Sequence, residues 1–209
     1  AITGHAMMVD RRTMDHPTGR GLASALCLGG LAVLNFDVRG HGDSGPGALA
    51  GGSWTYDDIV RLDLPAMVAA ARERFPGRPV AVVGHSLVGH AALVHAGLDP
   101  DGAADAVVAI AANLWAPRLE PALWARAAKG GVLLAWAALT RLMGAFDSRR
   151  LGWGSDAEAW PYVRQFLEIY LRDRLQSPGG EVDYAAALGR AAVPVFALSS
   201  EGDRLLARP

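Results

Sequence analysis

Apolar runs alternate with helical patterns through the first half of the chain. Runs at residues 31–36, 79–83 and 106–111 are bounded by glycine, proline or aspartate, as is typical of strands buried on both faces. Helical patterns separate these runs, and the one at residues 55–75 contains Pro65, where we expect a bend. Strands and helices that alternate at this spacing predict an α/β fold, a mainly parallel sheet with helices on both faces.

The alternation stops after the run at residues 106–111. The segment that follows has no strand pattern, but it has helical patterns at residues 119–143 and 157–175 and five of the six tryptophans. A last apolar run, at residues 193–198, returns to the strand pattern. The expected organisation is a core of residues 1–112 and 191–209 with a helical cap or lid of residues 113–190 inserted after the strand at 106–111.

Composition and charge narrow the class of protein. The 209 residues are 51% hydrophobic and 20% charged with a formal net charge of −1, which suits one globular domain with an inserted subdomain and argues against nucleic-acid binding. The longest apolar stretch, residues 130–139, is about half of what a membrane span needs. No signal peptide is visible, and we expect a cytoplasmic protein without an integral membrane segment. The single cysteine, Cys27, excludes an intrachain disulfide and is expected to be buried.

A serine follows the second apolar run at a predicted strand-to-helix corner. The sequence Gly-His-Ser-Leu-Val-Gly places Ser86 at the corner and small residues in the helix after it. Such a corner exposes the hydroxyl and directs free N–H groups towards the atom that it attacks; the alternative is a serine that only caps the helix. The stretch resembles the nucleophile elbow of the α/β-hydrolase family. Val88 departs from that pattern, because relatives usually have glycine there, and its side chain is expected to crowd the turn.

A second stretch carries the same resemblance. Residues 37–44 read Asp-Val-Arg-Gly-His-Gly-Asp-Ser and look like the D-x-R-G-H-G-x-S loop of many α/β hydrolases. In those relatives the charged groups of the loop hold one another and its glycines permit tight turns. The resemblance therefore implies a structural role for His41 rather than that of the catalytic base.

The family pattern also implies an oxyanion hole and a catalytic acid. The backbone N–H of Leu87, after the nucleophile, is the first expected donor, and that of Met7, in a His-Ala-Met segment after the first strand, is the second. Asp203, in a loop after the last strand, matches the family's acid. Glu201 is the alternative acid. The structural alternatives are that Met7 lies in an ordinary turn with no catalytic role and that the Asp203 carboxylate only caps backbone N–H groups of its loop.

The base is missing from the pattern, because the family order is Ser, then Asp or Glu, then His. No histidine follows Asp203. Either the chain is a fragment that lacks N-terminal strands and the C-terminal histidine segment, or the protein has lost its base and does not catalyse hydrolysis. The histidines are His5, His16, His41, His85, His90 and His95.

The expected function is that of a serine hydrolase that cleaves a carboxylic ester through an acyl-enzyme on Ser86. The expected partner is a small-molecule ester or acyl compound, apolar if the cap tryptophans line its site. An acyltransferase of the homoserine acetyltransferase type and a non-catalytic binding protein are the alternatives. No cofactor or metal is implied.

Overall fold

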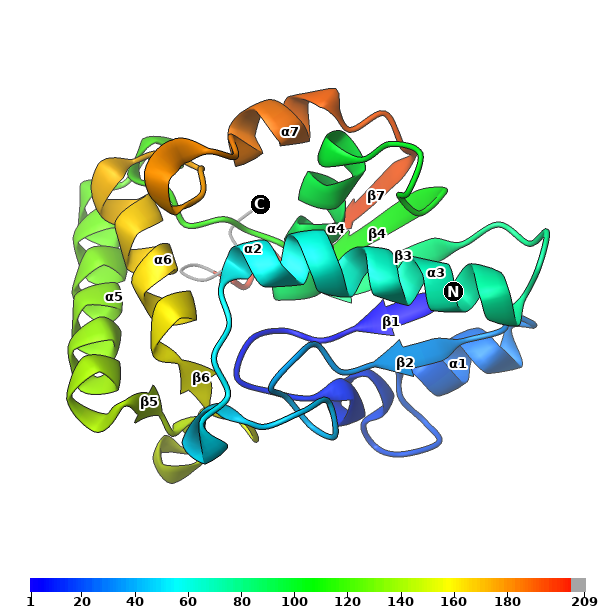
Figure 1. Ribbon diagram of the computed structural model, residues 1–209, viewed down its shortest axis with the longest axis horizontal. Coiled ribbons are helices and arrows are strands. Elements are labelled where there is room, and N and C mark those ends of the chain that lie inside the picture. Colours follow the sequence, from blue (N-terminus) through cyan, green and yellow to red (C-terminus); the bar gives the residue numbers. More distant parts are fainter. Residues whose placement is uncertain (204–209) are drawn as a thin grey trace.

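A five-stranded parallel sheet forms the centre of the molecule in the computed structural model, which describes residues 1–203 (Figure 1). The strand order is β2-β1-β3-β4-β7, and every neighbouring pair is parallel. This confirms the predicted α/β architecture. The strands are β1 (Ile2–Gly4), β2 (Leu34–Phe36), β3 (Ala81–His85), β4 (Ala106–Ile110) and β7 (Val195–Leu198).

Helices connect these strands and cover the sheet. Figure 1 shows α5 and α6 standing side by side beyond the ends towards which the arrows of β1 and β2 point, and these carboxyl ends are where parallel sheets present their ligand sites. The α-helices are α1 (Leu22–Leu28), α2 (Tyr56–Asp58), α3 (Leu64–Arg74), α4 (Leu87–Leu98), α5 (Leu123–Met143), α6 (Trp160–Arg172) and α7 (Tyr184–Arg190). Short 3₁₀ helices occupy Arg11–Asp15, Ala48–Ala50, Pro117–Leu119, Ser148–Leu151 and Pro178–Gly180.

The helical pattern at residues 55–75 forms one continuous helix with an irregular turn. Thr55 caps its start: the Asp58 N–H donates to the Thr55 side chain, and the Asp58 carboxylate accepts from the Thr55 N–H at 2.7 Å. The segment Ile59–Asp63 is π-helical and ends two residues before Pro65. Proline has no N–H to donate, so a wider turn is a natural response.

Two predictions about burial are wrong. The strand at residues 31–36 was expected to be buried on both faces, but β2 is an edge strand and its residues are only half-buried. Cys27, expected inside, is exposed, because α1 packs loosely on the molecule and buries only Ala23 near its start. The other edge strand, β7, is exposed along its whole length.

The segment at residues 113–190 contains two strands that the sequence did not predict. β5 (Ala145–Phe146) and β6 (Glu158–Ala159) pair antiparallel, and at two residues each they are too short to give a periodic pattern. α5 and α6 pack against each other, whereas α7 lies on α4. A Cβ at Gly97 would lie 1.7 Å from the Ala187 carbonyl oxygen, so the last helix of the segment is seated directly on the core.

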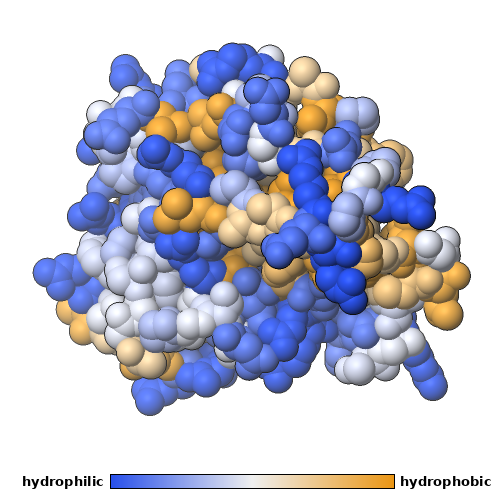
Figure 2. Space-filling view, turned by 45° about the vertical axis from the view of Figure 1, so that its right-hand side comes forward, coloured by the Kyte–Doolittle hydropathy of each residue, from blue (hydrophilic) through white to orange (hydrophobic). Residues whose placement is uncertain are grey.

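One hydrophobic cluster extends from the sheet into the helices of this segment. It joins Val82 and Leu87 of the elbow region with Trp136 of α5 and with Tyr162 and Phe166 of α6. Figure 2 shows apolar patches between hydrophilic residues on one face of the molecule. None of the helices in the described part of the chain is long and apolar enough to cross a membrane.

Candidate active site

Ser86 occupies a strained corner between β3 and α4. Its backbone has φ +46° and ψ −104°, a combination that residues other than glycine adopt only when the surroundings hold them there. The Ser86 N–H donates to the Ile110 carbonyl of β4 at 2.8 Å, and the Ser86 carbonyl accepts from the His90 N–H of α4 at 3.1 Å. These bonds fix the corner to both neighbouring elements and leave the side chain half-buried.

Close backbone contacts explain how the corner tolerates Val88. A Cβ at Gly84 would lie 2.4 Å from the Gly89 nitrogen, so the start of α4 presses on the end of β3. A Cβ at Gly4 would lie 2.4 Å from Val88 Cγ1. The valine expected to crowd the turn is therefore accommodated at the glycine that ends β1, and it is completely buried there.

A cavity of about 570 Å³ opens beside Ser86, within the size range of small-molecule sites. Its wall on the sheet side includes Met7, Ser86 and Asp203, three of the four candidate catalytic positions. The fourth, Leu87, is the first residue of α4, where the backbone N–H groups have no partner within the helix. The wall on the other side is apolar and consists of Trp115, Val132, Leu133, Trp136, Trp153 and Phe166.

Three of the five tryptophans in the segment at residues 113–190 face this cavity. They are Trp115, Trp136 and Trp153. Trp124 is 62% exposed on α5, and Trp160 lies under the Arg141 guanidinium, 6.0 Å from the ring centre. The sequence alone does not show which tryptophans face the cavity and which lie outside it, because all five are in the same segment.

Two further polar residues, which the sequence pattern did not single out, line the cavity. His85, directly before the serine, is one of them, and burial lowers its pKa. Asn113 is the other. Its place just after β4, the strand beside β3, is the signal that could have identified it.

The buried histidines His5 and His90 have structural partners. His5 Nε2 accepts from the Val38 N–H at 3.1 Å, and its Nδ1 lies 2.7 Å from the Ala6 carbonyl oxygen. Burial is the main cause that lowers its pKa. The Tyr56 hydroxyl lies 2.8 Å from His90 Nδ1, and burial lowers the pKa of His90 to about 3. Both rings are therefore neutral at physiological pH and are engaged in packing.

The loop at residues 37–44 is held by charged groups, but the ion pairs join the loop to residues outside it rather than to one another as expected. The Arg39 side chain donates to Asp63 at 2.8 Å, and Arg11 pairs with Asp37. His41 Nε2 lies 3.1 Å from Glu158 Oε1, both side chains being fully buried. Burial alone would lower the pKa of His41, but the Glu158 carboxylate raises it to about 9. His41 is not among the residues that line the cavity, which agrees with a structural role.

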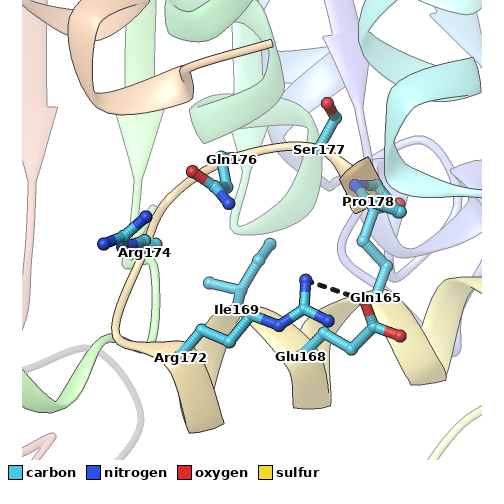
Figure 3. A pocket seen from close by; sticks show the side chains of 8 residues that line it. All are labelled: Gln165, Glu168, Ile169, Arg172, Arg174, Gln176, Ser177 and Pro178. Atoms are coloured by element: carbon cyan, nitrogen blue, oxygen red, sulfur yellow. Dashed lines mark ion pairs between the residues drawn. The ribbon is translucent and has the colours of Figure 1, made fainter. Parts of the chain in front are cut away.

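A second, small hollow lies between α6 and the loop at residues 174–178 that follows it (Figure 3). It has room for about 10 Å³, roughly one water molecule, and the Arg172–Glu168 ion pair at 3.7 Å crosses it. It is too small for an organic substrate. Within residues 1–203, no group of three or more histidine, cysteine or acidic side chains is arranged to hold a metal ion.

Comparisons with known proteins agree with this geometry. The solved structures that resemble the chain include one of the metagenome-derived lipolytic enzymes LipS and LipT (17% identity, TM-score 0.58) and a bacterial membrane phospholipase A described as a virulence factor (17% identity, TM-score 0.52). The alignments cover 94% of this chain and 69% of the first structure, and 98% of this chain and 63% of the second. At this identity they show the fold alone. No curated protein matches the chain significantly.

The family comparison covers most of the sequence. Residues 18–206 match the family described as serine aminopeptidase, S33, a match that includes the elbow and the loop at residues 37–44. The parallel sheet, the strained Ser86 at the strand-to-helix corner and the family match are all typical of an α/β hydrolase. The chain belongs to the S33 serine aminopeptidase family of α/β hydrolases.

Proposed function

We propose that the protein hydrolyses carboxylic esters of small apolar molecules through an acyl-enzyme on Ser86. The observation that supports this most directly is the strained Ser86 in the wall of a 570 Å³ cavity whose opposite wall is aromatic and aliphatic. A strained serine at a strand-to-helix corner is costly to maintain, and function is the common reason for such strain. An apolar wall favours an apolar acyl group.

In the proposed reaction, Ser86 Oγ attacks the ester carbonyl and the alcohol leaves. The backbone N–H groups of Leu87 and Met7 stabilise the negative oxygen of the tetrahedral intermediate. Asp203 orients a histidine that takes the serine proton, gives it to the leaving alcohol and then activates the water that releases the acid. No histidine follows Asp203 in the sequence, so we assign the base to no residue of this chain.

Covalent labelling tests the nucleophile without requiring turnover. The chain is incubated with a fluorophosphonate, and the adduct is located by peptide mass spectrometry. We expect an adduct on Ser86 that is absent from Ser86→Ala and unchanged in Ser53→Ala, an exposed serine outside the cavity wall. Labelling that persists in Ser86→Ala would exclude this nucleophile.

A substrate panel then separates the activities. Nitrophenyl esters report ester hydrolysis, and aminoacyl anilides report the peptidase activity after which the family is described. An acyl-CoA supplied with an alcohol reports acyl transfer, the alternative suggested by the His-Ala-Met segment at residues 5–7. Binding of esters without covalent labelling or turnover would instead support the non-catalytic alternative.

A further inference from the structure

Residues 154–158, in and just before β6, hold the loop that contains Met7 by contacts to the backbone of Met8. The Met8 N–H donates to Glu158 Oε1 at 2.6 Å, and the Met8 carbonyl accepts from the Asp156 N–H at 3.0 Å. A Cβ at Gly154 would lie 2.0 Å from the Met8 carbonyl oxygen, so the backbone there also touches Met8 directly. Both polar backbone atoms of Met8 are thus held by residues far away in the sequence.

The conformation of Met8 requires such support. Its φ is +63°, in the left-handed region that side chains other than glycine, asparagine and aspartate seldom adopt. The preceding peptide group, which contains the Met8 N–H, is continuous with Met7. The Met7 N–H itself belongs to the Ala6–Met7 peptide, whose carbonyl oxygen lies 2.7 Å from His5 Nδ1. With both neighbouring peptides held, the Met7 backbone beside Ser86 has little freedom to turn.

The carboxylate that accepts from Met8 is itself held in place. Glu158 is fully buried, and its Oε1 also faces His41 Nε2 at 3.1 Å, while His41 Nδ1 lies 2.9 Å from the Arg39 carbonyl oxygen. Asp156 extends the contact, because its Oδ1 accepts from the Gly42 N–H at 2.8 Å. The loop at residues 37–44 and the Met8 peptide therefore meet at a single carboxylate.

We propose that Glu158 is a positioning residue for the oxyanion hole: it fixes the Met7–Met8 peptide on one side of Met7, while His5 holds the Ala6–Met7 peptide on the other. Together these contacts direct the Met7 N–H towards the carbonyl that Ser86 attacks. This inference rests on the proposed function. It also means that the Met7 N–H takes this direction only when the residues in and just before β6 contact Met8.

Glutamine cannot replace the carboxylate fully. One oxygen of Glu158 accepts from both the Met8 N–H and the His41 ring. An amide oxygen in the same place would leave a protonated His41 without a counter-ion, whereas an amide NH₂ group there would face the Met8 N–H, donor against donor. The Glu158→Gln variant must therefore give up one of the two contacts.

Two variants disturb the Met8 peptide by different means. Glu158→Gln removes the charge, whereas Gly154→Ala leaves all charges and pushes a methyl group against the Met8 carbonyl. Glu168→Gln makes the same change on α6, where its carboxylate contacts only Arg164 and Arg172 among the ion pairs of the described residues. Gly131→Ala adds a methyl group in open space on α5. These two serve as matched controls.

The readout is the second-order rate constant for fluorophosphonate labelling of Ser86, since the phosphoryl oxygen occupies the oxyanion hole as the serine displaces fluoride. We expect both test variants to label roughly 100-fold more slowly than the wild type, since a 1 Å misplacement of a catalytic group costs this much. Both controls should label at the wild-type rate. Where ester turnover is measurable, kcat should fall while KM changes little.

The outcomes separate this inference from the proposed function. Wild-type protein that is not labelled at Ser86 overturns the proposed function and this inference with it. Rapid Ser86 labelling in folded Glu158→Gln and Gly154→Ala overturns the positioning role alone. Folding is checked by circular dichroism at the labelling temperature, and if Glu158→Gln does not fold, the rate for Gly154→Ala relative to Gly131→Ala decides.

Discussion

Gly4 explains how the elbow accommodates Val88, the residue that departs from the family pattern. The side chain of Val88 fills the space that a Cβ at Gly4 would need, at 2.4 Å from Cγ1. Neither residue lies in the other's element: Gly4 ends β1 and Val88 is in the first turn of α4. The missing glycine of the elbow is in effect replaced by a glycine on the neighbouring strand.

This complementarity predicts that Gly4→Ala destabilises the protein by about 1–3 kcal/mol, because overpacking in a rigid core forces neighbours to shift. The Gly4→Ala/Val88→Ala double variant should lose less stability than the sum of the two single variants, since removal of the two Val88 γ carbons relieves part of the clash and leaves only its Cβ, at 2.8 Å. Chemical denaturation of the four proteins measures the coupling. Simple additivity would show that the two side chains do not compete for space.

The buried pair of His41 and Glu158 predicts a loss of stability in alkaline solution. The pKa of His41 is raised from its ordinary value of 6.5 to about 9, so the folded state holds a proton that the unfolded state releases. The stabilisation is complete below about pH 6.5 and disappears as the pH rises through 9, roughly 3 kcal/mol in all. Denaturation from about pH 6 to 10 should show this decline in the wild type and a much flatter profile in Glu158→Gln. Parallel profiles would contradict the pairing.

At the level of single residues, the sequence identified Ser86, Met7 and Asp203 as neighbours of one site because each follows a strand of a parallel sheet, and such ends meet at one edge. It could not identify Glu158. That residue falls within residues 157–175, which were predicted to be helical, whereas the structure begins α6 at Trp160 and places Glu158 in β6. Its contact with Met8 depends on the path of the chain between β4 and β7. A buried carboxylate in a two-residue strand leaves no signal in a single sequence.

Among the elements, α5 carries a glycine pair whose members differ in their surroundings. A Cβ at Gly130 would lie 3.1 Å from the Tyr170 ring, whereas a Cβ at Gly131 would meet nothing within 4 Å. Gly131→Ala should therefore stabilise the protein by about 0.5–1 kcal/mol, because alanine loses less backbone entropy in a helix. Gly130→Ala should gain less or lose stability. Thermal unfolding of both variants checks the order, and equal shifts would show that Tyr170 moves aside freely.

The elements predicted from the sequence are those in which an apolar run or an amphipathic pattern continues over many residues. The long helices α5 and α6 and the strands β3 and β4 coincide with their predicted ranges to within a few residues. Burial at the sheet edges could not be predicted, because an apolar run such as that of β2 or β7 reads the same whether or not a neighbour covers it. Strand order, which decides the edges, is a property of the whole fold.

For the molecule as a whole, the cavity lies where two parts of the chain meet. The sheet ends supply Ser86, Met7 and Asp203, and α5 and α6 supply much of the apolar wall. The division into a core and a cap at residues 113–190 stays a prediction. At the end of that segment, α7 packs on α4 of the core. Under the proposed function, the wall formed by α5 sets the length of the acyl chain that fits.

Neighbouring leucines on α5 allow this to be tested. Leu133 is buried in the cavity wall, whereas Leu134 is 51% exposed and outside it. Leu133→Trp should shorten the longest acyl chain accepted, lowering kcat/KM for long nitrophenyl esters by about tenfold or more and leaving acetate esters nearly unchanged, because a methylene without room costs this much. Leu134→Trp places the same ring in solvent and should leave the chain-length profile as it is. A profile altered equally by both variants, or by neither, would show that the acyl chain does not lie against α5.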